Sequence, residues 1–297
     1  MSVDLLEQKT LIDDYLQRRP QALSAFSFTN LWTWKDFFEF RIEMIHNNLC
    51  LFAKNSLGCF LYLPPLGETV SPETVEECFH RMNQENRNSG VTRIEHVTEH
   101  HRLLFPEDRY HWYKKGYEYY YFRKDVVTLK GNAYKTKRAA YNYFVKNYKH
   151  EFVPYEEKMH DECMMLYGLW AVERMSKYSD PIYQQMVEEN RSVLRLALGF
   201  YKKLGLVGRV VVVDEQLKAF TLGYPLTDNV FCVIFEITDL TIKGLSVYIF
   251  REFCADKTIQ PFKFINVMDD FELSNIAKTK LSFRPIMLVP SYVVTKK

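Results

Sequence analysis

LVGRVVVVDEQLKAFTLGYPLTDNVFCVIFEI, residues 206–237, holds three consecutive β-strand patterns and decides the fold of this chain. Valine, isoleucine and phenylalanine favour strands, so we expect strands at 206–214, 217–224 and 230–237. Asp214-Glu215-Gln216 is short enough to form a tight hairpin turn between the first two strands. The sequence therefore predicts an antiparallel sheet whose third strand carries one carboxylate, Glu236, among apolar residues.

Helical patterns and further strands flank this sheet on both sides along the chain. A linking strand and a basic helix precede it, and a helix follows it directly. The elements that we expect here are strands at 117–122 and 152–155, helices at 130–149, 157–178 and 182–204, and, after the sheet, a helix at 243–254, a strand at 262–267, a helix at 271–280 and a strand at 283–293.

The first half of the chain follows nearly the same order, although sequence identity between the halves is negligible. Ser71-Pro72 supplies an N-cap and a first-turn proline for its central helix. We expect two domains, 1–115 and 116–297, and because no polar groups converge in the first half, we expect it to support the second. The expected elements are helices at 4–18 and 27–38, strands at 40–45, 49–54 and 59–63, a helix that ends before Gly90, a strand at 92–97, a helix at 98–104 and a strand at 110–114.

The composition is that of a globular protein with a core. The 297 residues are 47% hydrophobic and 26% charged, and the net charge of +2 does not by itself indicate a nucleic-acid binder. The six cysteines form no C-x-x-C pair, so we expect free thiols in a reducing cytoplasm. Neither a signal peptide nor an apolar run of about 18 residues occurs. We therefore expect a cytoplasmic protein that meets any membrane at its surface.

KGNAYKTKRAAYNYFVKNYK, residues 130–149, carries six basic residues and no acidic one. On a helix, five polar residues would share one face and five apolar residues the other. A polyanion, such as tRNA or the phosphates of a cofactor or lipid head group, is the natural partner of such a polar face. The polar face comprises Lys135, Arg138, Asn142, Lys146 and Lys149, and the apolar face comprises Tyr134, Tyr141, Phe144, Val145 and Tyr148.

Glu236 is the best-placed general base in the sequence. An apolar strand should raise its pKa, which suits a base that works near neutral pH. Asn266 and Lys280 come where the strand at 262–267 and the helix at 271–280 end, and could line the same site. His96, His100 and His101 do not predict a metal site, because we expect His96 on a strand rather than on a helix with the others.

The order of elements resembles that of the GCN5-related N-acetyltransferase (GNAT) fold. The resemblance implies an α+β chain of two tandem GNAT-like domains, each a mixed, mainly antiparallel sheet flanked by helices. It also implies that strands 230–237 and 262–267 splay apart and leave a slot for an acyl donor. Acetyl-CoA would need a glycine-rich phosphate loop at 238–245, where Lys243 and Gly244 stand beside a repelling Asp239.

Several motifs are similar to those of an uncharacterised bacterial family related to the C-terminal domain of phosphatidylglycerol lysyltransferases and, more distantly, to Fem-type peptidyltransferases. They span nearly the whole chain in the right order. The matches are Ser27-Phe28-Thr29-Asn30-Leu31 with Trp34 and Asp36, Leu63-Pro64-Pro65-Leu66-Gly67, Gly131, Tyr134, Lys137, Arg138, Asn142, Phe144 and Tyr148, Ile265-Asn266, and Lys278-Thr279-Lys280-Leu281-Ser282-Phe283-Arg284-Pro285.

This resemblance implies transfer of an acyl or aminoacyl group, with aminoacyl-tRNA or acyl-CoA as donor and a small molecule, a lipid head group or a peptide as acceptor. Glu236 would be the catalytic residue, and no metal or other cofactor is implied. The donor would meet the motif residues and their neighbours in the second half. These candidate donor-binding residues are Lys135, Lys137, Arg138, Asn142, Lys243, Gly244, Asn266, Lys278 and Lys280.

The chain also departs from the family pattern at three places. Ala139 and Phe283 stand where the family usually has asparagine and tyrosine, and Asn266-Val267-Met268-Asp269-Asp270 replaces Asn-Arg-Glu-Glu-Asp. An Arg–Glu pair and a phenol hydroxyl are therefore missing. Three hypotheses remain open: an acyl- or aminoacyltransferase, a binding protein on a decayed transferase fold, and an acetyl-CoA-dependent N-acetyltransferase.

Overall fold

Antiparallel strands flanked by helices make up both halves of the chain in the computed structural model, which describes residues 4–87 and 89–297. Contacts divide the chain into two units, Met1–Glu118 with Val289–Lys297 and Tyr119–Leu288. Strands β5 (Tyr110–Phe122) and β11 (Met287–Lys296) each run from one unit into the other. The chain is therefore α+β, as the sequence predicts.

The sheet of the second unit is mixed and mainly antiparallel. Its strands follow the order β5-β10-β9-β8-β7-β6, and β10 pairs parallel with β9 but antiparallel with β5. All other neighbours in this series are antiparallel. The strands are β6 (His150–Pro154), β7 (Val207–Val213), β8 (Gln216–Thr227), β9 (Val230–Thr238) and β10 (Phe264–Asn266).

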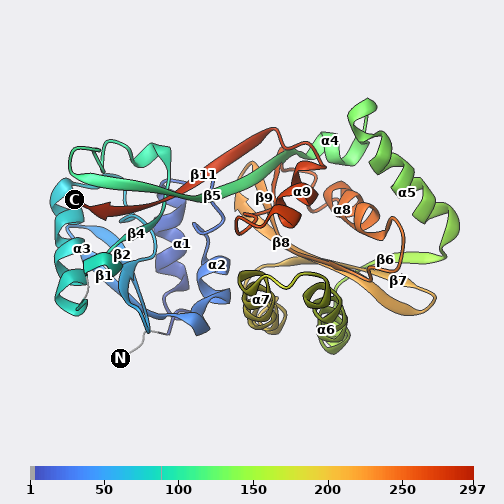
Figure 1. Cartoon of the computed structure of the whole chain (residues 1–297), viewed down its shortest axis with the longest axis horizontal. Coiled ribbons are helices and arrows are strands. Elements are labelled where there is room, and N and C mark those ends of the chain that lie inside the picture. Colours follow the sequence, from blue (N-terminus) through green and yellow to red (C-terminus); the bar gives the residue numbers. More distant parts are fainter. Residues whose placement is uncertain (1–3, 88) are drawn as a thin grey trace. The chain divides into compact units, whose positions relative to one another are not determined.

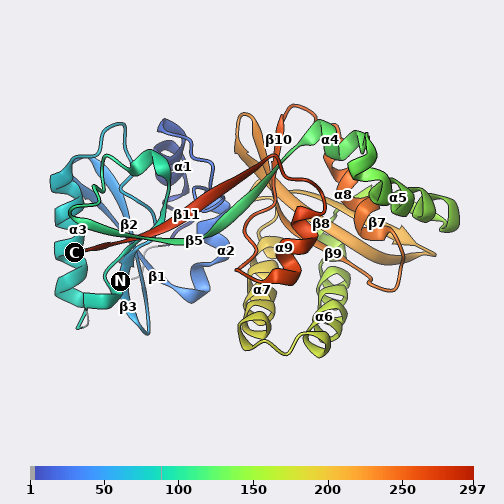
Figure 2. The ribbon, with the colours of Figure 1, turned by 45° about the horizontal axis from the view of Figure 1, so that its top comes forward.

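Helices cover both faces of this sheet, as Figures 1 and 2 show from two directions. Helix α8 (Leu245–Ala255) contacts β7, β8 and β9 on one face and carries α4 (Arg123–Thr128) and α5 (Lys135–Asn147) against it. Helices α6 (His160–Lys177) and α7 (Pro181–Gly199) lie on the other face. The short α9 (Ser274–Leu281) follows β10.

The basic segment is less regular than the single helix that we expect at 130–149. Gly131 has φ +85°, a left-handed conformation that suits glycine, and a 3₁₀ turn at Asn132–Tyr134 precedes α5. Tyr148 caps the end of α5 in an extended conformation, so Lys149 lies beyond the helix. Val145 is 44% exposed whereas Phe144 is fully buried, so Val145 does not belong to the apolar face.

The first unit combines a mixed, mainly antiparallel sheet with three helices. β1 (Glu39–Ile45), β2 (Asn48–Asn55) and β3 (Gly58–Leu61) form a meander, and β3 pairs parallel with β4 (Ile94–Val97). β11 then pairs antiparallel with β4. The helices are α1 (Lys9–Arg18), α2 (Phe28–Thr33) and α3 (Pro72–Glu85), and 3₁₀ turns span Lys35–Phe37, Ser89–Val91 and Glu99–His101.

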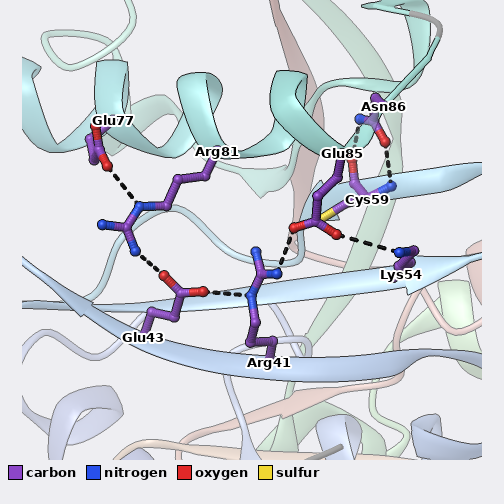
Figure 3. A network of polar contacts seen from close by, with 8 residues as sticks. All are labelled: Arg41, Glu43, Lys54, Cys59, Glu77, Arg81, Glu85 and Asn86. Atoms are coloured by element: carbon purple, nitrogen blue, oxygen red, sulfur yellow. Dashed lines mark hydrogen bonds and ion pairs between the residues drawn. The ribbon is translucent and has the colours of Figure 1, made fainter. Parts of the chain in front are cut away.

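Polar contacts join α3 to the sheet of the first unit (Figure 3). Arg81 pairs with Glu77 at 2.7 Å and also with Glu43, and Arg41 pairs with Glu85 at 2.5 Å. Asn86, which caps the end of α3, has an amide that bonds both backbone groups of Cys59 at 2.7 Å each. The sequence alone gave no sign of this network.

Some expected element bounds differ from the structure. The strands expected at 110–114 and 117–122 are one continuous strand, β5. The helix expected at 98–104 is only the 3₁₀ turn Glu99–His101, which begins with a capping box in which the His101 ring accepts a bond from the Thr98 N–H. The helix expected at 27–38 ends at Thr33 and gives way to a 3₁₀ turn.

None of the helices in residues 4–87 and 89–297 is both long and apolar enough to cross a membrane.

Candidate active site

The slot of the second unit opens where β9 and β10 separate. The two strands pair at Val230–Phe264, Phe231–Ile265 and Cys232–Asn266, and β9 then continues to Thr238 without β10. Asn266 ends the pairing, because its side-chain oxygen accepts the Met268 N–H at 2.6 Å and turns the chain through a left-handed residue, Met268 at φ +60°. The splay expected between these strands is therefore present.

A β-bulge in β9 aims Glu236 into this slot. The partners of β8 shift register between Leu222–Phe235 and Gly223–Val233, so Ile234 is the extra residue. Because a bulge reverses the alternation of side chains, Val233 and Glu236 line the same pocket. Gly223 is required at this bulge, since a Cβ there would lie 2.4 Å from the Cys232 oxygen.

The pocket in the slot has a volume of about 250 Å³ and mostly apolar walls. Its polar side chains are Glu236 on β9 and Thr279 and Lys280 on α9. The pocket therefore presents one carboxylate and one cation to anything that enters. Its remaining lining residues are Tyr121, Val233, Ile234, Phe250, Val267 and Phe283.

Around this pocket, the charges of Glu236 and Lys137 each partly offset the pKa shift that burial causes in the other residue. Burial raises the pKa of Glu236 to about 8, and the positive charge of Lys137 partly offsets that rise. Burial likewise lowers the pKa of Lys137, while the charge of Glu236 acts the other way. The Lys137 ammonium lies 3.9 Å from the centroid of the Phe283 ring, a cation–π contact that holds it over the pocket wall.

Lys280 and Asn266 shape the wall of the slot. The Lys280 ammonium donates to the Val267 oxygen at 2.6 Å and to the Asp269 oxygen, so it fastens the loop after β10 to α9. Asn266 is fully buried and turns the chain after β10. Lys280 also lines the pocket, whereas Asn266 does not.

The remaining candidates on the basic segment separate into two groups. Lys135 and Asn142 are exposed on α5, as is Lys278 on α9. Arg138 instead donates to the Gly131 oxygen at 2.6 Å and to the Leu129 oxygen, so it holds the turn between α4 and α5. Of the expected cationic face, Lys135 and Lys146 are exposed on α5, Lys149 is exposed just beyond its end, and Arg138 does not belong to it.

The special position of Lys137 could have been found in the sequence. It lies three residues after Tyr134 and four before Tyr141, and both tyrosines face the core. Residues with this spacing share a helical face, so a lysine here must project along the protein rather than into solvent. The family motif named Lys137, but helical spacing would have separated it from the exposed lysines.

A second pocket, of about 460 Å³, adjoins the first and shares Glu236 and Thr279 with it. Lys243 and Gly244, in the loop between β9 and α8, line this second pocket. Gly244 has φ +87°, and a Cβ would lie 2.2 Å from the Ala140 oxygen on α5. Gly244 is thus needed for the close approach of α5 and α8.

Two residues on the far side of the sheet also line this second pocket. Trp170 and Arg174 come from α6, and sequence reasoning did not single them out. They lie four residues apart on one helical face, but nothing local shows that this face meets the end of β9.

Asp239 does not present a free negative charge to the second pocket. Its carboxylate pairs with Lys218 at 3.0 Å and accepts from the backbone and hydroxyl of Thr241 at 3.0 and 2.6 Å. These bonds outweigh partial burial and hold the pKa of Asp239 below its ordinary value. The repulsion of phosphate expected from Asp239 is therefore largely compensated by Lys218.

The first unit holds buried polar groups that pair with one another. Glu118 accepts from the Ser24 N–H at 2.9 and 3.0 Å and from its hydroxyl at 2.6 Å. The Tyr62 hydroxyl donates to Asn30 at 2.7 Å. Residues far apart in sequence make these contacts, so spacing alone could not reveal them. No group of three or more His, Cys, Asp or Glu suited to a metal occurs in residues 4–87 and 89–297.

The model of the family described as phosphatidylglycerol lysyltransferase, C-terminal, matches residues 17–295. The chain belongs to this family. No curated protein sequence matches the chain. The match bears out the resemblance found in the motifs, and family and fold together indicate an acyl- or aminoacyltransferase.

Three solved structures show the same fold. A conserved protein of unknown function from Bacteroides thetaiotaomicron is 23% identical, with 100% of this chain and 99% of that chain covered and a TM-score of 0.88. L-PGS from Bacillus licheniformis is 16% identical, with coverages of 97% and 91% and a TM-score of 0.66. The C-terminal domain of a putative lysylphosphatidylglycerol synthetase from Agrobacterium fabrum is 12% identical, with coverages of 99% and 92% and a TM-score of 0.65.

Proposed function

We propose that the chain transfers an aminoacyl or acyl group onto an amine or hydroxyl acceptor, with Glu236 as the general base. The observation that carries this proposal is the position of Glu236 in the slot between β9 and β10, where burial raises its pKa to about 8. A carboxylate with a pKa near the working pH is suited to take and return a proton. Lys137, whose charge acts on Glu236, and Lys280, which lines the slot, can supply positive charge for an oxyanion.

The reaction follows from these groups when the donor is an aminoacyl ester. The Glu236 carboxylate accepts a proton from the acceptor nitrogen or oxygen as that atom attacks the ester carbonyl carbon. The new C–N or C–O bond forms and the ester C–O bond to the donor breaks. Glu236 then returns the proton to the departing hydroxyl of the donor, so no other co-reactant is needed.

Aminoacyl-tRNA is the donor that the charges favour. Lys135, Lys146 and Lys149 are exposed and form no ion pair among the described residues, so their positive field can attract a polyanion. Acyl-CoA has less support, because the loop at 238–245 offers one glycine and one lysine. The acceptor would be a lipid head group at a membrane surface, a peptide or a small molecule.

A binding protein on the same fold is the second candidate. Phe283 supports it, because this ring lines the pocket where the resembled family usually carries a tyrosine hydroxyl. The Phe283 ring packs against Phe250 with centroids 4.9 Å apart and adds no hydroxyl to the pocket. On this hypothesis the slot binds the donor without turning it over.

The test is a transfer assay with tRNA charged with labelled amino acids and, as acceptors, vesicles that contain phosphatidylglycerol, a short peptide and free amines. We expect transfer by the native chain and a loss of about 100-fold or more in Glu236→Gln, the size of a general-base contribution. Glu151→Gln, on the exposed part of β6, is the matched control and should transfer normally. Donor binding without transfer to any acceptor would favour the binding protein instead.

A further inference from the structure

The pocket next to the slot has the chemistry of a nucleotide site. We infer that the pocket lined by Trp170, Arg174 and Lys243 binds the terminal nucleoside phosphate of the donor, while its acyl group occupies the slot beside Glu236. This inference rests on the proposed function and extends it by naming the residues that recognise the nucleotide end of the donor.

The two pockets are arranged to hold one ligand in two parts. They share Glu236 and Thr279, so a molecule that fills both passes directly beside the candidate base. Their volumes differ, at about 250 Å³ for the slot and about 460 Å³ for its neighbour. Small-molecule sites usually measure about 300–1,000 Å³, so the slot suits the acyl end and the neighbour the larger end.

Aromatic rings give the larger pocket a surface on which a base can stack. Trp170 on α6 lines it with Tyr178 and Tyr183, whose rings lie 5.1 Å apart at the junction between α6 and α7. Trp170 is half-buried, which leaves part of its indole available. Stacking on such rings holds a base by its π-face, whatever acyl group the donor carries.

Cations in the same pocket suit a phosphate. Arg174 lies 5.8 Å from the centroid of the Trp170 ring, and its Nε is buried without a hydrogen-bond partner in the described part of the chain. Lys243 is exposed at the rim. The opposing carboxylates are weak: Asp239 pairs with Lys218, and the raised pKa of Glu236 leaves it largely uncharged at neutral pH. The pocket therefore favours an anion.

Direct titration of the full chain tests the site without any transfer reaction. Calorimetry would compare adenosine 5′-monophosphate, adenosine and inorganic phosphate as probes. We expect the monophosphate to bind most tightly, because it alone meets both the rings and the cations. Loss of one stacking or charge-assisted contact should weaken binding about tenfold, which corresponds to about 1.4 kcal/mol.

The variants separate ring recognition from phosphate recognition. Trp170→Ala should weaken the binding of both adenosine and its monophosphate, and Trp170→Phe should bind both more tightly than Trp170→Ala does. Arg174→Ala should weaken the binding of the monophosphate but not that of adenosine, and Arg174→Glu should bind the monophosphate more weakly still. Arg195→Ala is the matched control, because Arg195 is exposed on α7 and lines neither pocket. Circular dichroism would establish that each variant is folded.

Two results would overturn the inference. One is a native chain that binds the monophosphate no better than phosphate or adenosine. The other is unchanged monophosphate affinity in folded Trp170→Ala and Arg174→Glu. The transfer assay distinguishes this failure from failure of the proposed function. If the native chain transfers the group and Glu236→Gln does not, the proposed function is supported. If the pocket variants then keep the native KM for the donor, the nucleotide site is refuted while the proposed function is retained.

Discussion

Glu236 and Lys137 control each other's protonation across the slot pocket. A general base must be deprotonated to act, so the rate should rise with pH and level off above the pKa of Glu236, about 8. Lys137→Met removes the charge that lowers this pKa and should move the midpoint up by about one unit. Transfer rates from pH 6 to 10 measure the shift. Lys135→Met, on the exposed face of α5, should leave the midpoint in place.

The same carboxyl links stability to pH. Its folded pKa of about 8 lies above its ordinary value of 4.5, so the folded chain binds the extra proton. The stability that this proton gives is complete below about pH 4.5 and is lost as pH rises through about 8. Glu236→Gln keeps a neutral side chain, so its melting temperature should rise relative to that of the native chain as the pH increases from 5 to 9. For Glu151→Gln we expect a difference in melting temperature from the native chain that does not change with pH. The same constant difference for Glu236→Gln would contradict a raised pKa of the Glu236 carboxyl in the folded chain.

At the scale of elements, one side chain fixes the end of α3 to β3. The Asn86 amide bonds the N–H and the carbonyl of Cys59 at 2.7 Å each (Figure 3). It also donates to the Thr92 hydroxyl at 3.0 Å. Asn86→Ala leaves both backbone groups of a buried residue unsatisfied and should cost about 2–3 kcal/mol in the free energy of unfolding. Arg81→Ala removes only part-exposed ion pairs and should cost about 1 kcal/mol or less. Urea unfolding of both variants checks this order, and an equal or larger loss in Arg81→Ala would refute it.

The elements also show what the sequence could reveal. The strands at 206–237 were predictable, because apolar runs and a tight turn are local signals. The basic helix was placed too broadly, since Gly131 adopts a left-handed conformation and Tyr148 an extended one, neither of which spacing reveals. Glu236 was found from its apolar strand, but the bulge at Ile234 that aims it depends on pairing with β8. Trp170 and Arg174 were missed because only tertiary packing brings α6 to the end of β9.

At the scale of the whole molecule, charge is nearly balanced but unevenly distributed. The net charge is +2, yet the basic segment keeps Lys135, Lys146 and Lys149 exposed and without carboxylate partners among the described residues. By contrast, ion pairs engage many of the cations of the first unit, such as Arg81 and Arg109. A polyanion would therefore be attracted to one helix rather than to the protein at large.

The last prediction concerns this helix and its salt dependence. Lys135→Glu with Lys146→Glu should weaken tRNA binding about tenfold at 0.1 M salt and reduce the slope of log K against log salt by about 1–2, because each lost phosphate contact removes released counterions. Arg138 is unsuitable for this test, since its guanidinium holds the carbonyls of Leu129 and Gly131 and its loss would disturb the start of α5. Gel-shift titrations at several salt concentrations measure both quantities. Lys203→Glu with Lys257→Glu changes the net charge equally at exposed positions outside the helix, so an equal loss in this control would show that total charge, and not the face of α5, attracts the tRNA.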